Sequence, residues 1–192
     1  MLDGLSLDGK TVLITGGGTG LGLEMVKFLS RAGADICVAG RRLDPLNDAL
    51  REIDHNGQKG LAVSTDVADS TQVKTLVEKT LSEFGKIDVL INNAAVVAEN
   101  IVKPIWEIED DQWQTALDVN LSGAFYCSRE VSKHMADRGK GKIINTASGF
   151  GLRGGKDIYM YCCTKGGIIQ LTKVLSFSLA KYGITANTIV PG

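Results

Sequence analysis

Strand-like and helix-like segments alternate along nearly the whole of this 192-residue chain, and this alternation restricts the fold more than any other feature. The strand-like segments are 10–16, 35–40, 61–66, 87–95, 141–148 and 184–190. The helix-like segments, whose apolar residues recur at helical spacing, are 21–33, 43–57, 69–85, 109–138 and 157–183. Parallel strands are joined by right-handed helical crossovers. We therefore expect an α/β fold, one domain over residues 1–192, with a doubly wound parallel sheet in strand order 3-2-1-4-5-6.

Local signals mark the ends of several helices. Asp44 precedes Pro45, which predicts an N-cap followed by proline at the first helical position. Asp69 is predicted to cap the helix over 69–85, and Gly33 is predicted to stop the first helix. Ligands of doubly wound sheets bind at the carboxyl ends of the strands, so we expect a site where these ends meet.

Composition and charge exclude several classes of function. The formal net charge is −1 and no run of five like charges occurs, so a basic face for nucleic acid is not supported. The first ten residues do not resemble a secretory signal, and no apolar stretch approaches the ~20 residues of a membrane span. We therefore expect a cytoplasmic protein that binds neither nucleic acid nor membrane.

The cysteines and histidines do not form a metal-binding pattern. The four cysteines are Cys37, Cys127, Cys162 and Cys163. None forms a C-x-x-C motif, so we expect small buried thiols in a reducing compartment and no metal. His55 and His134 stand alone on what look like solvated helix ends, and we predict that neither is a ligand or a base.

A glycine-rich turn, T-G-G-G-T-G-L-G at 15–22, follows the first strand-like segment. Gly16, Gly20 and Gly22 have the spacing G-x-x-x-G-x-G. Such glycines allow a sharp turn, a close approach of backbone to a pyrophosphate, and close packing of the helix on the sheet. The helix that follows offers free N–H groups to phosphates. We expect a dinucleotide here; a glycine-rich turn without a ligand is the alternative.

Several motifs in order and at the right spacing resemble those of one enzyme family. The turn is similar to the T-G-x-x-x-G-x-G signature of the short-chain dehydrogenase/reductase (SDR) family, and N-N-A-A at 92–95 is similar to its N-N-A-G. The other matching positions are Asn120, Ser148, Tyr161, Lys165 and N-T-I-V-P-G at 187–192. The resemblance covers the chain from Lys10 onward. It implies a Rossmann-like fold and an NAD(P)-dependent oxidoreductase that forms a homotetramer through the helices over 109–138 and 157–183.

The chain departs from the family pattern at two places. Ala95 replaces a glycine beside the expected nicotinamide pocket. Family members also continue beyond the P-G motif with a substrate-covering segment and a seventh strand, and we expect both to be absent from this chain.

The resemblance also assigns residues to the cofactor. Asp66 would accept a hydrogen bond from the adenine amino group, with a turn or helix cap as its alternative role. Asn92–Ala94 would shape the nicotinamide pocket, and Ala94, Ala95, Val96 and the loop 149–157 would border the substrate. The expected cofactor residues are Gly16, Gly18, Thr19, Gly20, Leu21, Gly22, Arg41, Arg42, Asp66, Val67, Asn93, Ala94, Tyr161, Lys165, Pro191 and Gly192.

The end of the second strand-like segment favours NADP(H) over NAD(H). An NAD-binding chain typically carries an acidic residue there for the ribose hydroxyls, about 20 residues past the glycines. Here Gly40 takes that place and is followed by Arg41 and Arg42. Two cations without a carboxylate suit a 2′-phosphate, because arginine binds phosphate bidentately. Two solvated surface arginines are the alternative.

Tyr161 and Lys165 are the residues expected to carry the chemistry. They are four apart and so share one helix face. A tyrosine can act as acid and base when its pKa falls from ~10 towards neutrality, and a nearby ammonium favours the phenolate. By resemblance, Lys165 also binds the nicotinamide ribose, Ser148 holds the substrate oxygen, and Asn120 supports a water between Lys165 and solvent. Each of these residues alone would more often serve packing or local hydrogen bonding.

The sequence leaves the substrate open. We expect a secondary alcohol or ketone among sugar acids, polyols and 3-oxoacyl thioesters, with a preference for a small sugar-like molecule. Arg153 and Lys156 could attract an anionic substrate or be solvated, and Trp106 and Trp113 are predicted to pack against the long helix. The alternatives to an enzyme are a truncated or non-catalytic dinucleotide-binding module and a structural scaffold.

Overall fold

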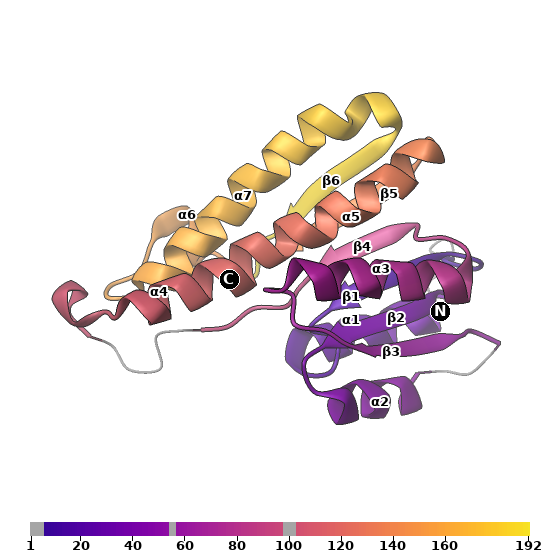
Figure 1. Cartoon of the computed structure of the whole chain (residues 1–192), viewed down its shortest axis with the longest axis horizontal. Coiled ribbons are helices and arrows are strands. Elements are labelled where there is room, and N and C mark those ends of the chain that lie inside the picture. The colour runs from indigo at the N-terminus through magenta and orange to yellow at the C-terminus, as the bar shows by residue number, and fades with distance from the viewer. Residues whose placement is uncertain (1–5, 54–56, 98–102) are drawn as a thin grey trace.

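The computed structural model describes residues 6–53, 57–97 and 103–192. Its strands are β1 Thr11–Thr15, β2 Asp35–Gly40, β3 Gly60–Ser64, β4 Val89–Asn92, β5 Gly141–Thr146 and β6 Ile184–Ile189. All are parallel in the order β3-β2-β1-β4-β5-β6, which confirms the predicted fold class and strand order (Figure 1). The order reverses between β1 and β4. The loops that follow these two strands therefore lead in opposite directions and leave a crevice between them.

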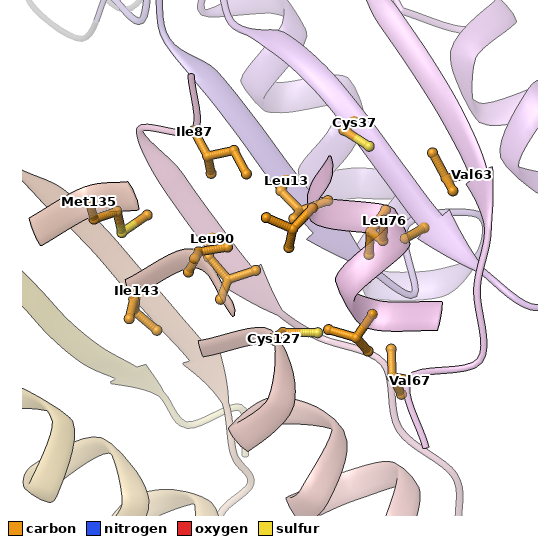
Figure 2. Packing of buried hydrophobic residues seen from close by; sticks show 14 of the residues in the cluster. Leu13, Cys37, Val63, Val67, Leu76, Ile87, Leu90, Cys127, Met135 and Ile143 are labelled. Carbon is orange, nitrogen blue, oxygen red and sulfur yellow. The ribbon is translucent and has the colours of Figure 1, made fainter. Parts of the chain in front are cut away.

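Helices cover both faces of the sheet, so the central strands are apolar on both sides. One face carries α1 Gly20–Arg31 and α2 Leu43–Arg51, which pack on Val12 and Ile14 of β1. The other carries α3 Ser70–Phe84, α5 Gly123–Asp137 and α7 Tyr159–Leu179 (Figure 1). Figure 2 shows this second cluster, in which Leu13 and Leu90 of the sheet lie near Leu76 of α3. Burying a side chain of this size stabilises the fold by about 1.5–3 kcal/mol.

The long helix predicted over 109–138 is divided. The 3-10 turn Ile105–Glu107 precedes α4 Asp110–Ala116, and a π-helical segment, Leu117–Ser122, joins α4 to α5. A π turn holds one more residue than an α turn, and apolar periodicity does not reveal where it falls. The loop expected over 149–157 also contains a helix, α6 Phe150–Arg153, and a 3-10 turn, Ala180–Tyr182, follows α7.

The predicted helix ends are partly correct. Asp69 caps α3, accepting hydrogen bonds from the Thr71 and Gln72 amides at 2.8 and 3.2 Å. Gly33 lies two residues past α1 in the left-handed region, with φ 100°, as a stop signal should. The prediction for Asp44 is wrong, because α2 begins at Leu43 with Arg42 as its N-cap and ends at Arg51 rather than near 57. Pro45 is then the third helical residue, whose missing N–H would have had no intrahelical partner.

A buried polar network ties β4 and β5 to the helices behind them. Asn92 and Asn145 are paired in register, and Asn92 Nδ2 donates to Asn145 Oδ1 at 2.8 Å and to Ser128 Oγ at 3.1 Å. Asn145 Nδ2 donates in turn to Thr172 Oγ1 of α7 at 2.8 Å. Asn92 Oδ1 has no partner among the described residues. The carboxyl ends of these strands are thereby fixed against α5 and α7.

Two of the four cysteines are buried as predicted. Burial raises the pKa of the Cys37 and Cys127 thiols to about 12. Cys163 is exposed and Cys162 half-buried, so the prediction of buried thiols is wrong for Cys163. No disulfide joins the four cysteines, all of which lie in the described part of the chain, and the described residues contain no group of three or more His, Cys, Asp or Glu placed to hold a metal ion.

His134 ties α5 to the start of β4. Its Nε2 accepts a hydrogen bond from the Ile87 amide at 3.2 Å, and burial lowers its pKa, which keeps the ring neutral and able to accept. His55 lies outside the described residues. Trp106 is 81% exposed and Trp113 is 39% exposed, so Trp106 does not pack against the helix as predicted. In the part of the chain that the structure describes, no helix is long and apolar enough to cross a membrane.

Candidate active site

The glycine turn between β1 and α1 has the backbone geometry that a pyrophosphate requires. Gly16 has φ 67°, and a Cβ there would lie 2.8 Å from Ala94 Cα. A Cβ on Gly22 would clash with the Gly16 carbonyl oxygen. Gly20 has φ 54° and faces space with no atom within 4 Å of an added Cβ. Two glycines thus close the turn onto its neighbours, while the third supplies the left-handed backbone conformation and faces open space.

The start of α1 is suited to an anion. Its N-cap residue, Thr19, makes no side-chain capping hydrogen bond, and its first turn carries no acidic residue. The first N–H groups of a helix lack intrahelical acceptors and lie at the positive end of its dipole. A phosphate is the group that such an end binds most readily.

A cavity of about 380 Å³ extends from this turn to the ends of β2 and β3. The expected cofactor residues that line it are Gly16, Gly18, Thr19, Leu21, Gly22, Arg41, Arg42, Asp66, Val67, Asn93 and Ala94. Pro45 and Leu46 of α2 also line it, although the sequence analysis did not assign them to the cofactor. Asp66 faces the cavity and also accepts from the Ala68 amide through Oδ1 at 3.0 Å, so its turn role is present as well. Gly20 does not line the cavity.

Thr15 fastens the glycine turn to the loop after β4. Its Oγ1 accepts from the amides of Asn93 and Ala94, each at 3.1 Å. Asn93 Nδ2 returns hydrogen bonds to the carbonyl oxygens of Thr15 and Gly16 at 3.2 and 3.1 Å. Thr15 is the first residue of the motif at 15–22, but the sequence analysis gave it no role, because its partners lie 78 and 79 residues further along the chain. These four hydrogen bonds hold the glycine turn and the loop after β4 at a fixed separation.

A second cavity, of about 440 Å³, lies over the ends of β5 and β6. It is lined by Ser148, Tyr161, Lys165, Pro191 and Gly192, all expected at the site. Leu21, Asn93 and Ala95 line both cavities, so the two adjoin. An elongated ligand can therefore run from the glycine turn to Tyr161.

Lys165 is buried beneath Tyr161. It is 3% exposed, and its Nζ donates to the Thr146 carbonyl oxygen at 2.7 Å. The same Nζ lies 5.5 Å from the centroid of the Tyr161 ring. Desolvation lowers the pKa of Lys165 to about 8. Thr146, at the end of β5, thus positions the ammonium, and no motif in the sequence indicated that role.

Ser148 and Asn120 are placed differently from each other. The Ser148 Oγ accepts from the Phe150 amide at 3.2 Å, which leaves its own proton available to an oxygen in the cavity. Asn120 lies buried in the π-helical segment and lines neither cavity. Its amide bonds both backbone groups of Val96, at 2.8 and 2.9 Å, and Thr164 Oγ1 at 3.1 Å. The side chain therefore pins the loop after β4 to α7 and stands behind the cavity wall.

Comparisons with known proteins agree with this geometry. The chain is 34% identical over 185 residues to the 3-oxoacyl-[acyl-carrier-protein] reductase FabG of Staphylococcus epidermidis, covering 95% of this chain and 74% of the relative. A crystal structure of NAD⁺-bound xylitol dehydrogenase matches with a TM-score of 0.92 at 32% identity, over 96% of this chain and 70% of that one. A gluconate 5-dehydrogenase from Burkholderia cenocepacia in complex with NADP and tartrate matches with a TM-score of 0.90 at 36% identity, over 98% and 72%.

The match to a family is equally extensive. The short chain dehydrogenase family fits residues 10–192, which include the glycine turn and both cavities. The three relatives are a reductase and two dehydrogenases. The chain therefore belongs to the short-chain dehydrogenase family, as an oxidoreductase that acts on CH–OH groups.

Proposed function

We propose that this protein is an NADP(H)-dependent oxidoreductase that interconverts a secondary alcohol and a ketone, with Tyr161 as its general acid and base. One observation carries the proposal. Tyr161 and the buried Lys165 lie on one face of α7, in a cavity that adjoins the glycine turn. This juxtaposition supplies a proton donor, a charge that stabilises its conjugate base, and a neighbouring place for a dinucleotide.

The chain's own residues handle the proton. In reduction, the Tyr161 hydroxyl donates its proton to the carbonyl oxygen while Ser148 donates a hydrogen bond to the same oxygen. When bound, the nicotinamide cofactor supplies the hydride, or accepts it in the reverse direction. The Lys165 ammonium, 5.5 Å from the Tyr161 ring centroid, stabilises the phenolate that forms. Asn120 acts indirectly. It would support a water between Lys165 and solvent, and its side chain holds Val96 in place through two hydrogen bonds.

Arg41 and Arg42 support NADP(H) as the cofactor. Both are exposed and line the first cavity beside Gly40, the last residue of β2. A carboxylate at that position would repel a 2′-phosphate, and glycine does not. The Arg41 carbonyl accepts from Ser64 Oγ at 3.0 Å, which fixes the backbone from which its guanidinium extends. The NADP-bound gluconate 5-dehydrogenase supports this preference, whereas the xylitol dehydrogenase was seen with NAD⁺.

Removing both guanidinium groups is expected to reverse the cofactor preference. In an Arg41→Ala, Arg42→Ala double variant, the KM for NADPH rises by about 10- to 100-fold, because hydrogen bonds to charged groups contribute about 1.5–3 kcal/mol. The KM for NADH changes little, since NADH lacks the 2′-phosphate. Steady-state kinetics with each cofactor at a fixed ketone concentration measures both. Equal losses with NADPH and NADH would contradict a phosphate-binding role, and an Arg51→Ala variant serves as control because Arg51, at the end of α2, lines neither cavity.

The substrate is proposed to be a small sugar-like alcohol or ketone. The xylitol and gluconate dehydrogenases, which match this fold at 32% and 36% identity, support polyols and sugar acids. The FabG relative supports 3-oxoacyl thioesters as the second class. A screen that follows oxidation of NADPH with ketones of both classes distinguishes them. Failure of every ketone and alcohol with both cofactors, in protein shown to bind NADPH, would instead indicate a non-catalytic dinucleotide-binding module.

The protein is further proposed to form homo-oligomers through α5 and α7. Both helices present large apolar side chains to solvent, namely Phe125, Val174 and Phe177, the last 85% exposed. A partner subunit packed on these helices would remove the three side chains from water. Light scattering coupled to gel filtration measures the assembly directly.

A further inference from the structure

The second cavity contains a cation that the proposed proton transfer does not use. Arg153, the last residue of α6, lines this cavity together with Ser148 and Tyr161. We propose that the Arg153 guanidinium binds a carboxylate carried by the substrate, close to the reacting carbonyl. The inference rests on the proposed function and narrows its substrate class to oxo acids and the corresponding hydroxy acids, which include sugar acids.

The guanidinium is held in position by its own helix. Its Cζ lies 5.4 Å from the centroid of the Phe150 ring, a cation–π contact within the same short helix. A Cβ placed on Gly149 would lie 3.9 Å from that Cζ. Gly149 directly follows Ser148, so the cation stands next to the residue that is proposed to hold the substrate oxygen. The contact with Phe150 favours one position of the guanidinium over others, although the residue is exposed.

The charges around the second cavity favour an anion. Among the described residues that line it, Arg153 and Lys165 are the only charged side chains, and none is an aspartate or a glutamate. Lys165 is buried and donates to the Thr146 carbonyl. Arg153 is exposed, and within residues 6–53, 57–97 and 103–192 it forms no ion pair. The guanidinium is thus the group left to pair with a charge on the ligand.

The second cavity also has apolar walls. Val97, Phe150 and Ile158 line it and offer contact to the carbon skeleton that joins the carboxylate to the reacting carbonyl. An arginine binds a carboxylate with two parallel hydrogen bonds, which fixes the orientation as well as the position of the acid. A carboxylate on Arg153 and an oxo group between Ser148 and Tyr161 would therefore present the carbonyl carbon in one orientation. The reaction balances as oxo acid, NADPH and one proton giving hydroxy acid and NADP⁺.

The alternative is that Arg153 is a solvated loop cation, and Lys156 provides the comparison. Lys156 is exposed, three residues further along the same loop, and lines neither cavity. A general attraction of anions by the positive charge of the loop would depend on both residues. A built carboxylate site depends on Arg153 alone.

The test compares 3-oxobutanoate with its methyl ester, which have the same reacting ketone and differ only in charge. Wild type, Arg153→Gln, Arg153→Lys and Lys156→Gln are assayed for kcat/KM with NADPH. In Arg153→Gln, the ratio of kcat/KM for the acid to that for the ester is expected to fall about 10- to 100-fold, the range for a lost charge-assisted hydrogen bond. Arg153→Lys recovers part of the ratio, and Lys156→Gln retains all of it. An unchanged ratio in Arg153→Gln, or an equal fall in Lys156→Gln, overturns the proposal.

Failure of the proposed function is distinguishable from failure of this inference. If wild type turns over the ester as well as or better than the acid, the oxidoreductase stands and the carboxylate site is wrong. If neither is reduced, calorimetric titration of 3-hydroxybutanoate into the NADP⁺-saturated protein decides. Binding that is about tenfold or more weaker in Arg153→Gln, but unchanged in Lys156→Gln, supports the site without any turnover. Equal binding in all variants, or none in wild type, overturns it.

Discussion

Replacing Tyr161 with phenylalanine is expected to lower kcat by about 100- to 10,000-fold, the contribution typical of a positioned general acid. The phenyl ring fills the same volume, so the packing of α7 is retained while the transferable proton is lost. Affinity for NADPH is expected to stay within about threefold of wild type, since no more than one neutral hydrogen bond is removed. Single-turnover reduction of a ketone measures the first quantity, and calorimetric titration of NADPH measures the second.

Tyr159→Phe is the matched control for this experiment. Tyr159 lies two residues earlier, lines neither cavity, and donates its hydroxyl to Asp157 Oδ1 at 2.9 Å. That hydrogen bond raises the pKa of Tyr159, which makes it a weaker acid and keeps its hydroxyl protonated. Wild-type turnover in Tyr161→Phe would contradict the assignment of Tyr161 as the general acid. An equal loss of kcat in Tyr159→Phe would indicate that the substitutions damage the start of α7 and do not remove a catalytic group.

Replacing Gly22 with alanine is expected to damage both stability and cofactor binding. The new methyl group would clash with the carbonyl oxygen of Gly16. That oxygen belongs to the backbone, and a Cβ is fixed to its own backbone, so neither atom can rotate away. Forcing one methyl group into such a contact costs about 1–3 kcal/mol of unfolding free energy. The displaced turn is expected to weaken NADPH binding about tenfold or more, which corresponds to a loss of about 1.4 kcal/mol. Chemical denaturation and calorimetry measure the two effects.

Gly40→Ala tests whether any added methyl group in the first cavity would have the same effect. Gly40 lines that cavity, but the nearest atom to its added Cβ is the flexible Leu46 Cδ2 at 3.4 Å, an ordinary contact. We expect a change in unfolding free energy within about 0.5 kcal/mol. If Gly22→Ala changes the unfolding free energy as little as Gly40→Ala does, close packing of α1 on the turn does not require glycine at position 22.

The sequence predicted most of the fold because the periodicity of its apolar residues agreed with the residues that mark the ends of helices. Alternating segments specified the strand order, and Asp69 and Gly33 marked helix ends by local chemistry that does not depend on the rest of the chain. The spacing of Tyr161 and Lys165 placed them on one helix face, and the structure brings them to one cavity.

The rest depended on contacts between distant segments. The π-helical segment that holds Asn120 is stabilised by the backbone of Val96, 24 residues earlier, and periodicity within one helix cannot show such a partner. Thr15 and Thr146 position other groups through hydrogen bonds to segments far along the chain, so their roles could not be inferred from the local sequence. The Asp44–Pro45 signal misled because proline is tolerated at any of the first helical positions, so it marks a helix start only approximately.

The buried pairing of Asn92 with Asn145 has a consequence for how the two halves of the chain assemble. Apolar strands can slide past one another by two residues and still bury their side chains. Here such a slip of β5 along β4 would separate the two amides and detach Asn145 from Thr172, leaving buried polar groups unpaired. The amide pair therefore selects one alignment during folding. Since Thr146 follows Asn145 directly, the same alignment also positions the Thr146 carbonyl oxygen that accepts the hydrogen bond from Lys165 Nζ, and it does so without a bound ligand.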